Sequence, residues 1–265
     1  MVLPARAEIN ADLLNAIVEA EGLGELHLVL RDGPDQAVWY PHSYRETLAS
    51  RVREECTRLG WYDRRGQLEI EIEAALRVLC AGSVEYFGWV RHPLDEGGEA
   101  VTGVVVAAIA REAVLAIRRG NTVWLSQISN ANKLPERLVA QLPPVRPGSG
   151  QPLRAPQRDI AAVRSDGRTR NQGGVALRRA APDARHIRQI MALPSFGGGE
   201  LYGGVRDGHG IYRRSDRPIR YTDTDRGRYR ATITDTPDDT YVEVAPGSDA
   251  DLINQLRAVQ RSLTR

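Results

Sequence analysis

The sequence predicts an α+β protein built on one antiparallel β-sheet with an internal pseudo-twofold repeat, and three observations lead to this fold class. The last third of the chain, residues 197–265, repeats the plan of the middle third. Both copies place their strands first and a helix last, with hairpin-length connections that make successive strands antiparallel neighbours. The first 80 residues carry mainly helical patterns, whose apolar stripes face a core.

The first 80 residues are divided by capping and turn signals. Gly22 can end the first helix in a left-handed C-cap. Ser43 and Glu46 have the spacing of a capping box and begin the second helix. Between these helices, alternating side chains followed by Asp32-Gly33 predict a strand and a turn. In chain order, we expect a helix over 9–20, a strand over 25–31, and helices whose apolar stripes cover 48–59 and 68–79.

The repeat itself accounts for the middle and the end of the chain. In the first copy we expect strands over 86–91, 103–110, 112–118 and 123–128, then a helix over 133–142. In the second copy we expect strands over 200–207, 211–214, 228–234 and 241–244, then a helix over 249–264. Ser248 and Asp251 form a capping-box variant at the start of that last helix.

The two copies are joined by a segment of different composition. Residues 146–174 are rich in arginine, glycine and proline, and 151–172 have no sustained apolar period, which predicts a flexible connection. Short helices are compatible with 159–164 and 183–193. Nine arginines between Arg154 and Arg188 also fit a nucleic-acid arm. The segment has no aromatic side chain for base stacking, so we expect no nucleic-acid partner.

Composition and charge fit an ordinary globular protein. Lys+Arg of 36 against Asp+Glu of 34 gives a formal charge of +2, too balanced to indicate a nucleic-acid or membrane partner. Cys56 and Cys80 are too few for a disulfide framework. The first residues lack the pattern of a signal peptide. The longest apolar stretch, 104–117, is interrupted by Arg111 and Glu112. We therefore expect a cytosolic protein that does not insert into a membrane.

No motif in the sequence assembles a catalytic, metal or cofactor site. The five histidines never fall at metal-ligand spacing with each other or with the cysteines. The glycine run 197–199 lacks the Gly-Lys-Ser/Thr ending of a phosphate loop. Asp223 and Asp225 have a spacing found in some divalent-cation sites, but the arginines that follow favour a solvated hairpin. We expect no metal, no cofactor and no enzymatic activity.

Several short motifs stand in a characteristic order along the chain. The last third contains Arg206-Asp207 followed by Arg213-Arg214-Ser215, then Asp223 followed by Gly227-Arg228-Tyr229, and Pro246 before the terminal helix. The middle third contains Gly120-Asn121-Thr122-Val123 and Leu142-Pro143. In this order they resemble the EspG-type chaperones of the ESX (type VII) secretion systems of actinobacteria, over nearly the whole chain. The arginine-rich connection departs from the family pattern.

This resemblance implies a fold and a function. The fold is a central antiparallel β-sheet with an internal pseudo-twofold repeat, flanked by two helical bundles. It forms a single domain over 1–265, with halves of about 1–145 and 175–265. The function is that of a cytosolic chaperone, which binds a PE–PPE-type helical heterodimer and shields its apolar tip before secretion. Two alternative functions stay open: a generic protein-binding adaptor without a secretion role, and an enzyme built on an α+β sheet. A weak homodimer also stays open as an oligomeric state.

The expected partner surface combines one sheet face with a loop and a hairpin. By alternation, Phe87, Trp89 and Arg91 share a face of their strand. Tryptophan and arginine are enriched at binding hot spots, although Trp89 can equally pack beneath the helices. The loop over 91–101 is long for a hairpin and is therefore expected to have a use. The predicted partner-binding residues are Trp89, Arg91, Leu94, Glu96, Glu99, Arg213, Arg214 and Arg220.

Overall fold

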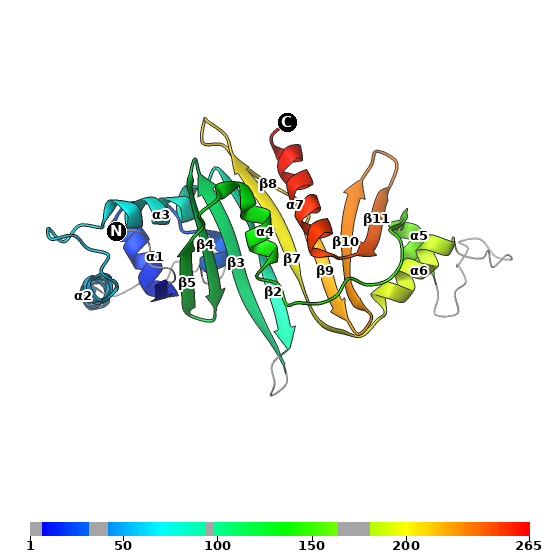
Figure 1. The fold of residues 1–265 in the computed structure, drawn as a ribbon, viewed down its shortest axis with the longest axis horizontal. Helices are drawn as coiled ribbons and strands as arrows, with labels where there is room; N and C mark the ends of the chain where they lie inside the picture. The colour runs from blue at the N-terminus through cyan, green and yellow to red at the C-terminus, as the bar shows by residue number, and fades with distance from the viewer. Residues whose placement is uncertain (1–6, 32–41, 94–97, 164–180) are drawn as a thin grey trace.

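The computed structural model describes residues 7–31, 42–93, 98–163 and 181–265, and gives the backbone alone for residues 42–46. In this part of the chain, eleven strands form one sheet (Figure 1). The N-terminal half contains β1 (Ala7–Asn10), α1 (Ala11–Ala20), η1 (Leu28–Leu30), α2 (His42–Leu59), α3 (Ile70–Ala81), β2 (Val84–Pro93), β3 (Glu99–Ile109), β4 (Glu112–Arg119), β5 (Thr122–Gln127), η2 (Ala131–Lys133) and α4 (Leu134–Val139).

The C-terminal half repeats this series with one addition. It contains β6 (Leu153–Pro156), α5 (Gln157–Ala162), α6 (Pro182–Met191), β7 (Ser195–Arg206), β8 (Tyr212–Arg214), β9 (Ile219–Thr224), β10 (Gly227–Asp235), β11 (Thr240–Pro246) and α7 (Asp249–Leu263). Strand β8, which pairs with β7 beyond the end of β9, is the addition.

Among the described helices, none is long and apolar enough to cross a bilayer.

The order of the strands shows the internal symmetry. The sheet runs β1-β5-β4-β3-β2-β7-β9-β10-β11-β6, and neighbouring strands are antiparallel. Reading outward from the β2–β7 pair, both halves present four strands in chain order, apart from β8, which lies off this path, and the first strand of each half closes the outer edge. The pseudo-twofold axis therefore passes between β2 and β7. The predicted antiparallel sheet with an internal repeat is confirmed.

Helices cover the two faces of the sheet differently. We call front the face covered by α4 and α7, which lie before the sheet in Figure 1. Their apolar side chains form a core with Tyr86 and Val90 of β2 and with Leu201 of β7. On the opposite, rear face, α1, α2 and α3 pack over β2 to β5. At the other end of the rear face, α5 and α6 pack over β6, β10 and β11.

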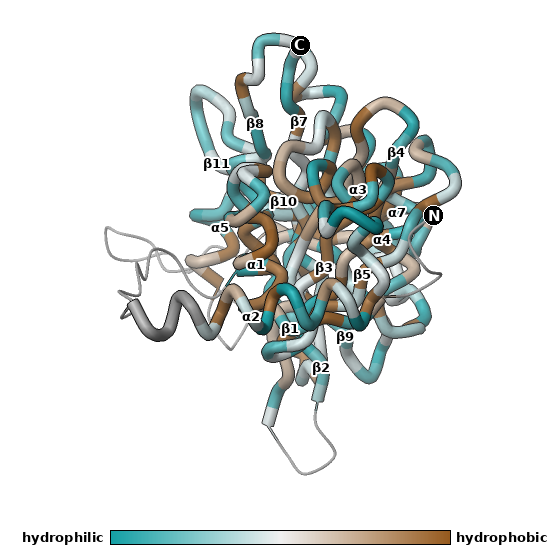
Figure 2. The backbone as a smooth tube through the Cα atoms, turned by 90° about the vertical axis from the view of Figure 1, so that its left-hand side faces the viewer, coloured by the Kyte–Doolittle hydropathy of each residue, from teal (hydrophilic) through white to brown (hydrophobic). Residues whose placement is uncertain are grey.

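The rear face therefore has an uncovered centre. The two rear clusters lie towards opposite ends of the sheet, and of the described rear-facing residues of β7 and β9 only Tyr202 packs against either of them. The apolar residues that support this arrangement are concentrated in elements such as α1 and β3 (Figure 2). Val104, Val105 and Val106 of β3 are all buried because helices cover both faces of that strand. Such continuous β-branched runs fit strands buried on both sides.

Two local expectations for the N-terminal part and the sheet are wrong. Residues 25–31, expected as a strand, contain the 3-10 turn η1, because the His27 ring accepts a hydrogen bond from the Val29 amide at 3.2 Å. Leu26, Val29 and Leu30 are buried, so the apolar residues of this segment pack into the core, and their alternation does not indicate pairing with another strand. Strands β1, β6 and β9 were not expected.

The connection between the halves is more regular than its composition predicted. Within residues 146–163, β6 pairs with β11 through Leu153–Pro156, and α5 follows directly. The Gly148 amide also donates to the carbonyl of Arg228 at 2.8 Å. Residues 146–163 therefore contain regular elements that their composition did not predict, because the short strand completes the sheet edge. Residues 164–174 lie outside the described part.

A buried ion pair lies on the front face, beneath the start of α7. Both oxygens of Asp223 accept hydrogen bonds from Arg228, at 2.6 and 2.9 Å, and each side chain is 1% exposed. The Arg228 guanidinium also lies 4.7 Å from the centroid of the Tyr221 ring. The interpretation of this segment as a solvated hairpin is therefore wrong for Asp223. The Asp and Arg of the family-like motif are partners in the core.

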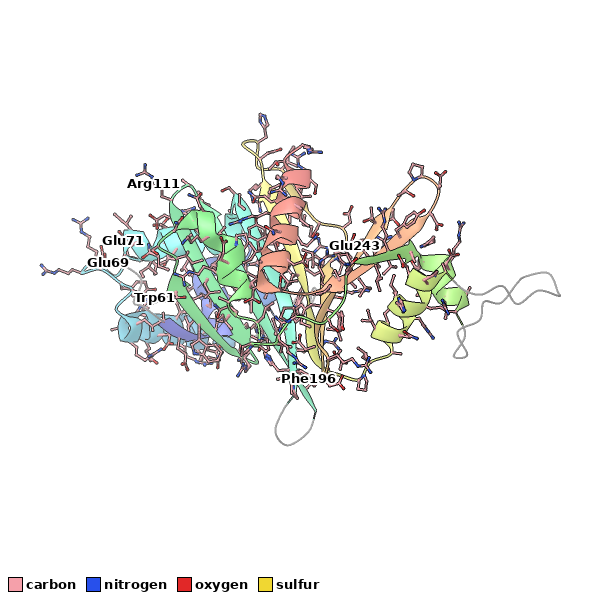
Figure 3. All side chains as sticks on the ribbon, turned by 45° about the vertical axis from the view of Figure 1, so that its right-hand side comes forward. Trp61, Glu69, Glu71, Arg111, Phe196 and Glu243 are labelled. Atoms are coloured by element: carbon pink, nitrogen blue, oxygen red, sulfur yellow. The ribbon has the colours of Figure 1, made fainter. Side chains whose placement is uncertain are left out.

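A second buried arginine extends this polar layer. Arg230 donates to Glu243 at 2.7 Å and to Asp251 at 2.5 Å, which ties β10 to β11 and to the first turn of α7. Glu243 lies on β11, and Figure 3 labels it. Burial by itself would lower the pKa of the Arg230 guanidinium, but its bonds to Asp251 and Glu243 outweigh this effect, and the pKa is raised. Paired, hydrogen-bonded charges of this kind tolerate burial.

The Asp223→Ala variant is expected to lower the free energy of unfolding by about 3–5 kcal/mol, because it leaves Arg228 buried without its carboxylate partner. Guanidinium titration followed by circular dichroism measures the change. Glu73→Ala is the matched control, since it breaks the exposed Glu73–Arg77 pair of α3 and is expected to cost less than about 0.5 kcal/mol. Equal losses in the two variants would contradict the structural role given to the Asp223–Arg228 pair.

Candidate functional site

The uncovered centre of the rear face is lined by side chains from β2, β7, β8 and β9. Trp89 and Tyr202 pack against the rear α1–α3 cluster, which fixes the face to which they point. Because residues that are directly opposite share a face, the registers define cross-strand rows on this face. These rows are Glu85–Gly204–Arg214, Phe87–Tyr202, Trp89–Glu200–Arg220 and Arg91–Gly198–Thr222.

An aromatic group forms the floor of this region. Tyr202 stacks on Phe87 with ring centroids 5.3 Å apart, and Trp89 meets both rings edge-on at 5.9 and 6.1 Å. Phe87 is buried, whereas Trp89 and Tyr202 are half-buried. His27 packs against the far side of Phe87 at 4.7 Å. Trp89 and Tyr202 therefore combine support from the core with accessible surface.

Glu200 links the aromatic group to an arginine. One of its oxygens accepts a hydrogen bond from Tyr202 at 2.9 Å, and the other accepts from Arg220 at 2.8 Å. Burial and the bond to Glu200 raise the pKa of the Tyr202 hydroxyl. The carboxylate thus holds the phenol ring and the guanidinium in a fixed relation across two strands.

Two further arginines complete the surface. Arg91 forms an ion pair with Glu99 at 3.7 Å, and both side chains are exposed. Arg214 is exposed, and no described residue forms a hydrogen bond or ion pair with its guanidinium. We define the central patch as Trp89, Arg91, Glu200, Tyr202, Arg214 and Arg220 on the rear face.

The structure brings most of the predicted partner-binding residues together, with one on the other face. Trp89, Arg91, Arg214 and Arg220 belong to the central patch, and Glu99 borders it. Arg213 is paired with Val205 in the register, so it points to the front, where it meets Asp207 at 3.2 Å. Leu94 and Glu96 lie outside the described residues.

Tyr202 and Glu200 were not among the predicted residues, although alternation along the strand 200–207 places both on one face. Two exposed apolar side chains lie near the end of the sheet that carries Arg91. Val101, opposite Arg91 in the register, is 50% exposed. Phe196, at the start of β7, is 46% exposed and lies at the end of the sheet where β2 and β3 terminate (Figure 3).

A hollow of about 260 Å³ lies further along the rear side, between α6 and the β9–β10 turn. Tyr229, Ile190 and Leu193 give it an apolar lining, and Arg226 and His186 also line it. Tyr229 is opposite Thr222 in the sheet, so the hollow continues the row that begins with Arg91. In the described residues, no three His, Cys, Asp or Glu side chains gather as they would around a metal ion.

A group of buried polar contacts lies beside the central patch, at the end that carries Arg214. The Tyr212 hydroxyl of β8 donates to the Glu85 carboxylate of β2, and the same oxygen lies 3.3 Å from Nε2 of His27. Burial opposes the ionisation of Glu85, but the contacts with His27 and Tyr212 outweigh it, and the pKa of Glu85 is lowered. Ionised Glu85 therefore connects the N-terminal helical layer to β8.

The Glu85→Gln variant is expected to be less stable than the wild type at neutral pH, with a difference that shrinks in acid. Because the folded state lowers the pKa of Glu85, its stabilisation is present above the ordinary value of 4.5 and is lost as the pH falls through the folded value. Urea unfolding between pH 3 and pH 7 measures the difference, and Glu25→Gln on the surface is the control. A difference that stays constant with pH would contradict the role of the carboxylate.

Comparisons with known proteins agree with this architecture. A family model described as the EspG family matches residues 10–258. Among solved structures, the chain is similar to the Mycobacterium tuberculosis type VII secretion system chaperone EspG5, solved in complex with the PE25–PPE41 dimer. That match has a TM-score of 0.66 and 12% sequence identity, and it covers 96% of this chain and 95% of the other. A search of curated proteins found no match. With the family model spanning almost its entire length, this chain belongs to the EspG family.

Proposed function

We propose that this protein is a cytosolic secretion chaperone that binds a PE–PPE-type helical heterodimer of a type VII system and shields its apolar tip. The observation that carries the proposal is the family match over residues 10–258. The similarity in fold to a chaperone solved with the PE25–PPE41 dimer supports it. We further propose that the protein works by binding alone, without catalysis.

The central patch is the surface that we assign to the partner. Its floor consists of two half-buried aromatic rings between two helical clusters, so a partner can bury them without moving the core. Rings that are held in place lose little conformational entropy on binding, and tryptophan, tyrosine and arginine are common hot-spot residues. Val101 and Phe196 add exposed apolar area at one end. A contiguous apolar area with a polar rim is typical of a protein-binding site.

The arginines supply the polar part of the recognition. Arg91 and Arg220 each have a carboxylate partner within the chain, whereas Arg214 has none among the described residues. A guanidinium offers planar donors to a carboxylate or to the free carbonyls at a helix C-terminus. We therefore assign to Arg214 a direct bond to the tip of the helical partner. The hollow beside α6 can receive an apolar side chain from the same partner.

Co-expression with a PE–PPE pair encoded in the same genome is expected to yield a soluble complex that contains one copy of this chain. Size-exclusion chromatography with multi-angle light scattering measures the composition. A pair of helices of similar length that is not a type VII substrate serves as the negative control. If no PE–PPE pair binds, the proposed function is wrong, and binding of the control pair alone would indicate a general adaptor.

The adjacent residues Arg213 and Arg214 provide a matched test of the assigned face. Arg214→Ala is expected to weaken partner binding by about 1–3 kcal/mol, because its side chain lies on the central patch. Arg213→Ala removes the same group from the opposite face and is expected to change the affinity less than about twofold. Isothermal titration calorimetry measures both dissociation constants. Trp89→Ala is expected to weaken binding to a similar extent as Arg214→Ala.

Thermal unfolding of each variant separates loss of contact from loss of fold. Equal dissociation constants for the Arg213 and Arg214 variants would show that the partner does not bind at the central patch. A Trp89→Ala variant that unfolds cooperatively yet binds as well as the wild type would lead to the same conclusion.

A further inference from the structure

Strand β8 is short, and one side-chain bond ties it to the middle of the sheet. It comprises Tyr212–Arg214 and pairs with β7 alone. Tyr212 reaches across β7 to the Glu85 carboxylate on β2. Three strands are therefore connected by a single phenol ring, and its partner Glu85 is 5% exposed.

Gly204 of β7 makes this crossing possible. A Cβ atom at this position would lie 2.6 Å from the Tyr212 hydroxyl oxygen and 2.9 Å from Oε1 of Glu85. Both distances are shorter than van der Waals contact, so any side chain here would displace the phenol from the carboxylate. Within the row Glu85–Gly204–Arg214, the residue without a side chain is therefore the one that the Tyr212 ring crosses.

His27 orients the carboxylate from the other side. Its Nδ1 accepts a hydrogen bond from the Val29 amide at 3.2 Å, which leaves the ring proton on Nε2. That nitrogen lies 3.3 Å from Oε1 of Glu85, which also accepts from Tyr212. The oxygen is thus held by donors from both halves of the chain, and its position does not depend on β8 alone.

Arg214 is the residue that this arrangement controls. Arg214 and Tyr212 are two positions apart on β8, so their side chains share the rear face. Burial and Glu85 raise the pKa of the Tyr212 hydroxyl, and the nearby charge of Arg214 opposes that rise. A three-residue strand with one paired neighbour frays easily unless a side chain holds it.

We propose that Tyr212 and Glu85 are positioning residues for partner recognition, which hold β8 so that Arg214 points into the central patch. This inference rests on the proposed function, because it concerns the same partner. If Tyr212 and Glu85 had a merely structural role, their substitution would lower the stability of the protein. It would also weaken partner binding by the same factor with Arg214 present as with Arg214 replaced by alanine. A positioning role acts through Arg214, so its effect on affinity requires that residue.

The test is a double-mutant cycle between Tyr212→Phe and Arg214→Ala, measured by calorimetry with a PE–PPE pair. The phenylalanine variant keeps the ring and loses only the hydroxyl. It is expected to weaken binding about fivefold to tenfold when Arg214 is present, and less than about twofold in the Arg214→Ala background. Additive losses in the cycle would overturn the proposal.

Hydrogen exchange of the free protein provides the second readout. In Tyr212→Phe, the amides of β8 are expected to exchange at least about threefold faster, while those of β10 stay unchanged. Gly204→Ala should reproduce both effects, because it displaces the same ring. Unchanged exchange in β8 would overturn the proposal. Failure of the wild-type chain to bind any PE–PPE pair is the distinct outcome in which the proposed function fails and this inference falls with it.

Discussion

The pairing of β2 with β7 is the interaction on which the rest of the structure depends. It joins the two halves through a register that runs from Val84 opposite Val205 to Arg91 opposite Gly198. A slip of one residue would turn the side chains of a strand to the other face. Trp89 would then face α4 and α7, and Tyr86 would leave the front core. The candidate site exists because this register is fixed.

The same axis explains why the centre of the rear face is open. A twofold axis perpendicular to a sheet maps each face onto itself, so related helices must lie on the same face. The α1–α3 cluster and the α5–α6 cluster both lie at the rear, the first over β2 to β5 and the second over β6, β10 and β11. Because α4 and α7 cover the middle of the front, the strands at the axis have a supported core beneath them. Symmetry thus produces a rigid floor between two helical walls.

Much of this architecture could be predicted from the sequence, and the exceptions have physical reasons. The strands β7 and β10 and the helix α7 showed clear periodicity, and the Ser248 hydroxyl does accept from the Asp251 amide at 3.1 Å. Strand β9 was missed because its buried residues include Asp223 and Thr224, whose polarity indicated solvent. Only the pairing with Arg228 makes burial of Asp223 favourable, and that partner is set by the tertiary structure.

The candidate site was predicted in part, for a related reason. Alternation within a strand places Trp89 and Arg91 on one face, and this needs no knowledge of neighbouring strands. Alternation also separates Arg213 from Arg214, but which of the two faces the central patch depends on how β8 pairs with β7, and local patterns do not reveal this pairing. The link from Tyr202 through Glu200 to Arg220 likewise requires the register of three strands. Contacts between residues on different strands depend on the register of the folded sheet, and the sequence of one strand does not determine that register.

The departures from symmetry matter as much as the symmetry. A floor with a true twofold axis would offer the same contacts to a partner in two opposite orientations, whereas a heterodimer has two different subunits. Strand β8 has no counterpart among the described residues that flank the end of the β2–β3 pair, where Pro93 is opposite Glu99. Arg214 and Tyr212 therefore mark one end of the patch, and Arg91, Glu99 and Val101 mark the other. Arg214, which forms no hydrogen bond or ion pair with any described residue, lies at one end of the floor, and the exposed Val101 lies at the other. The two ends of the floor therefore differ, and under the proposed function this difference would select one orientation of an asymmetric helical tip.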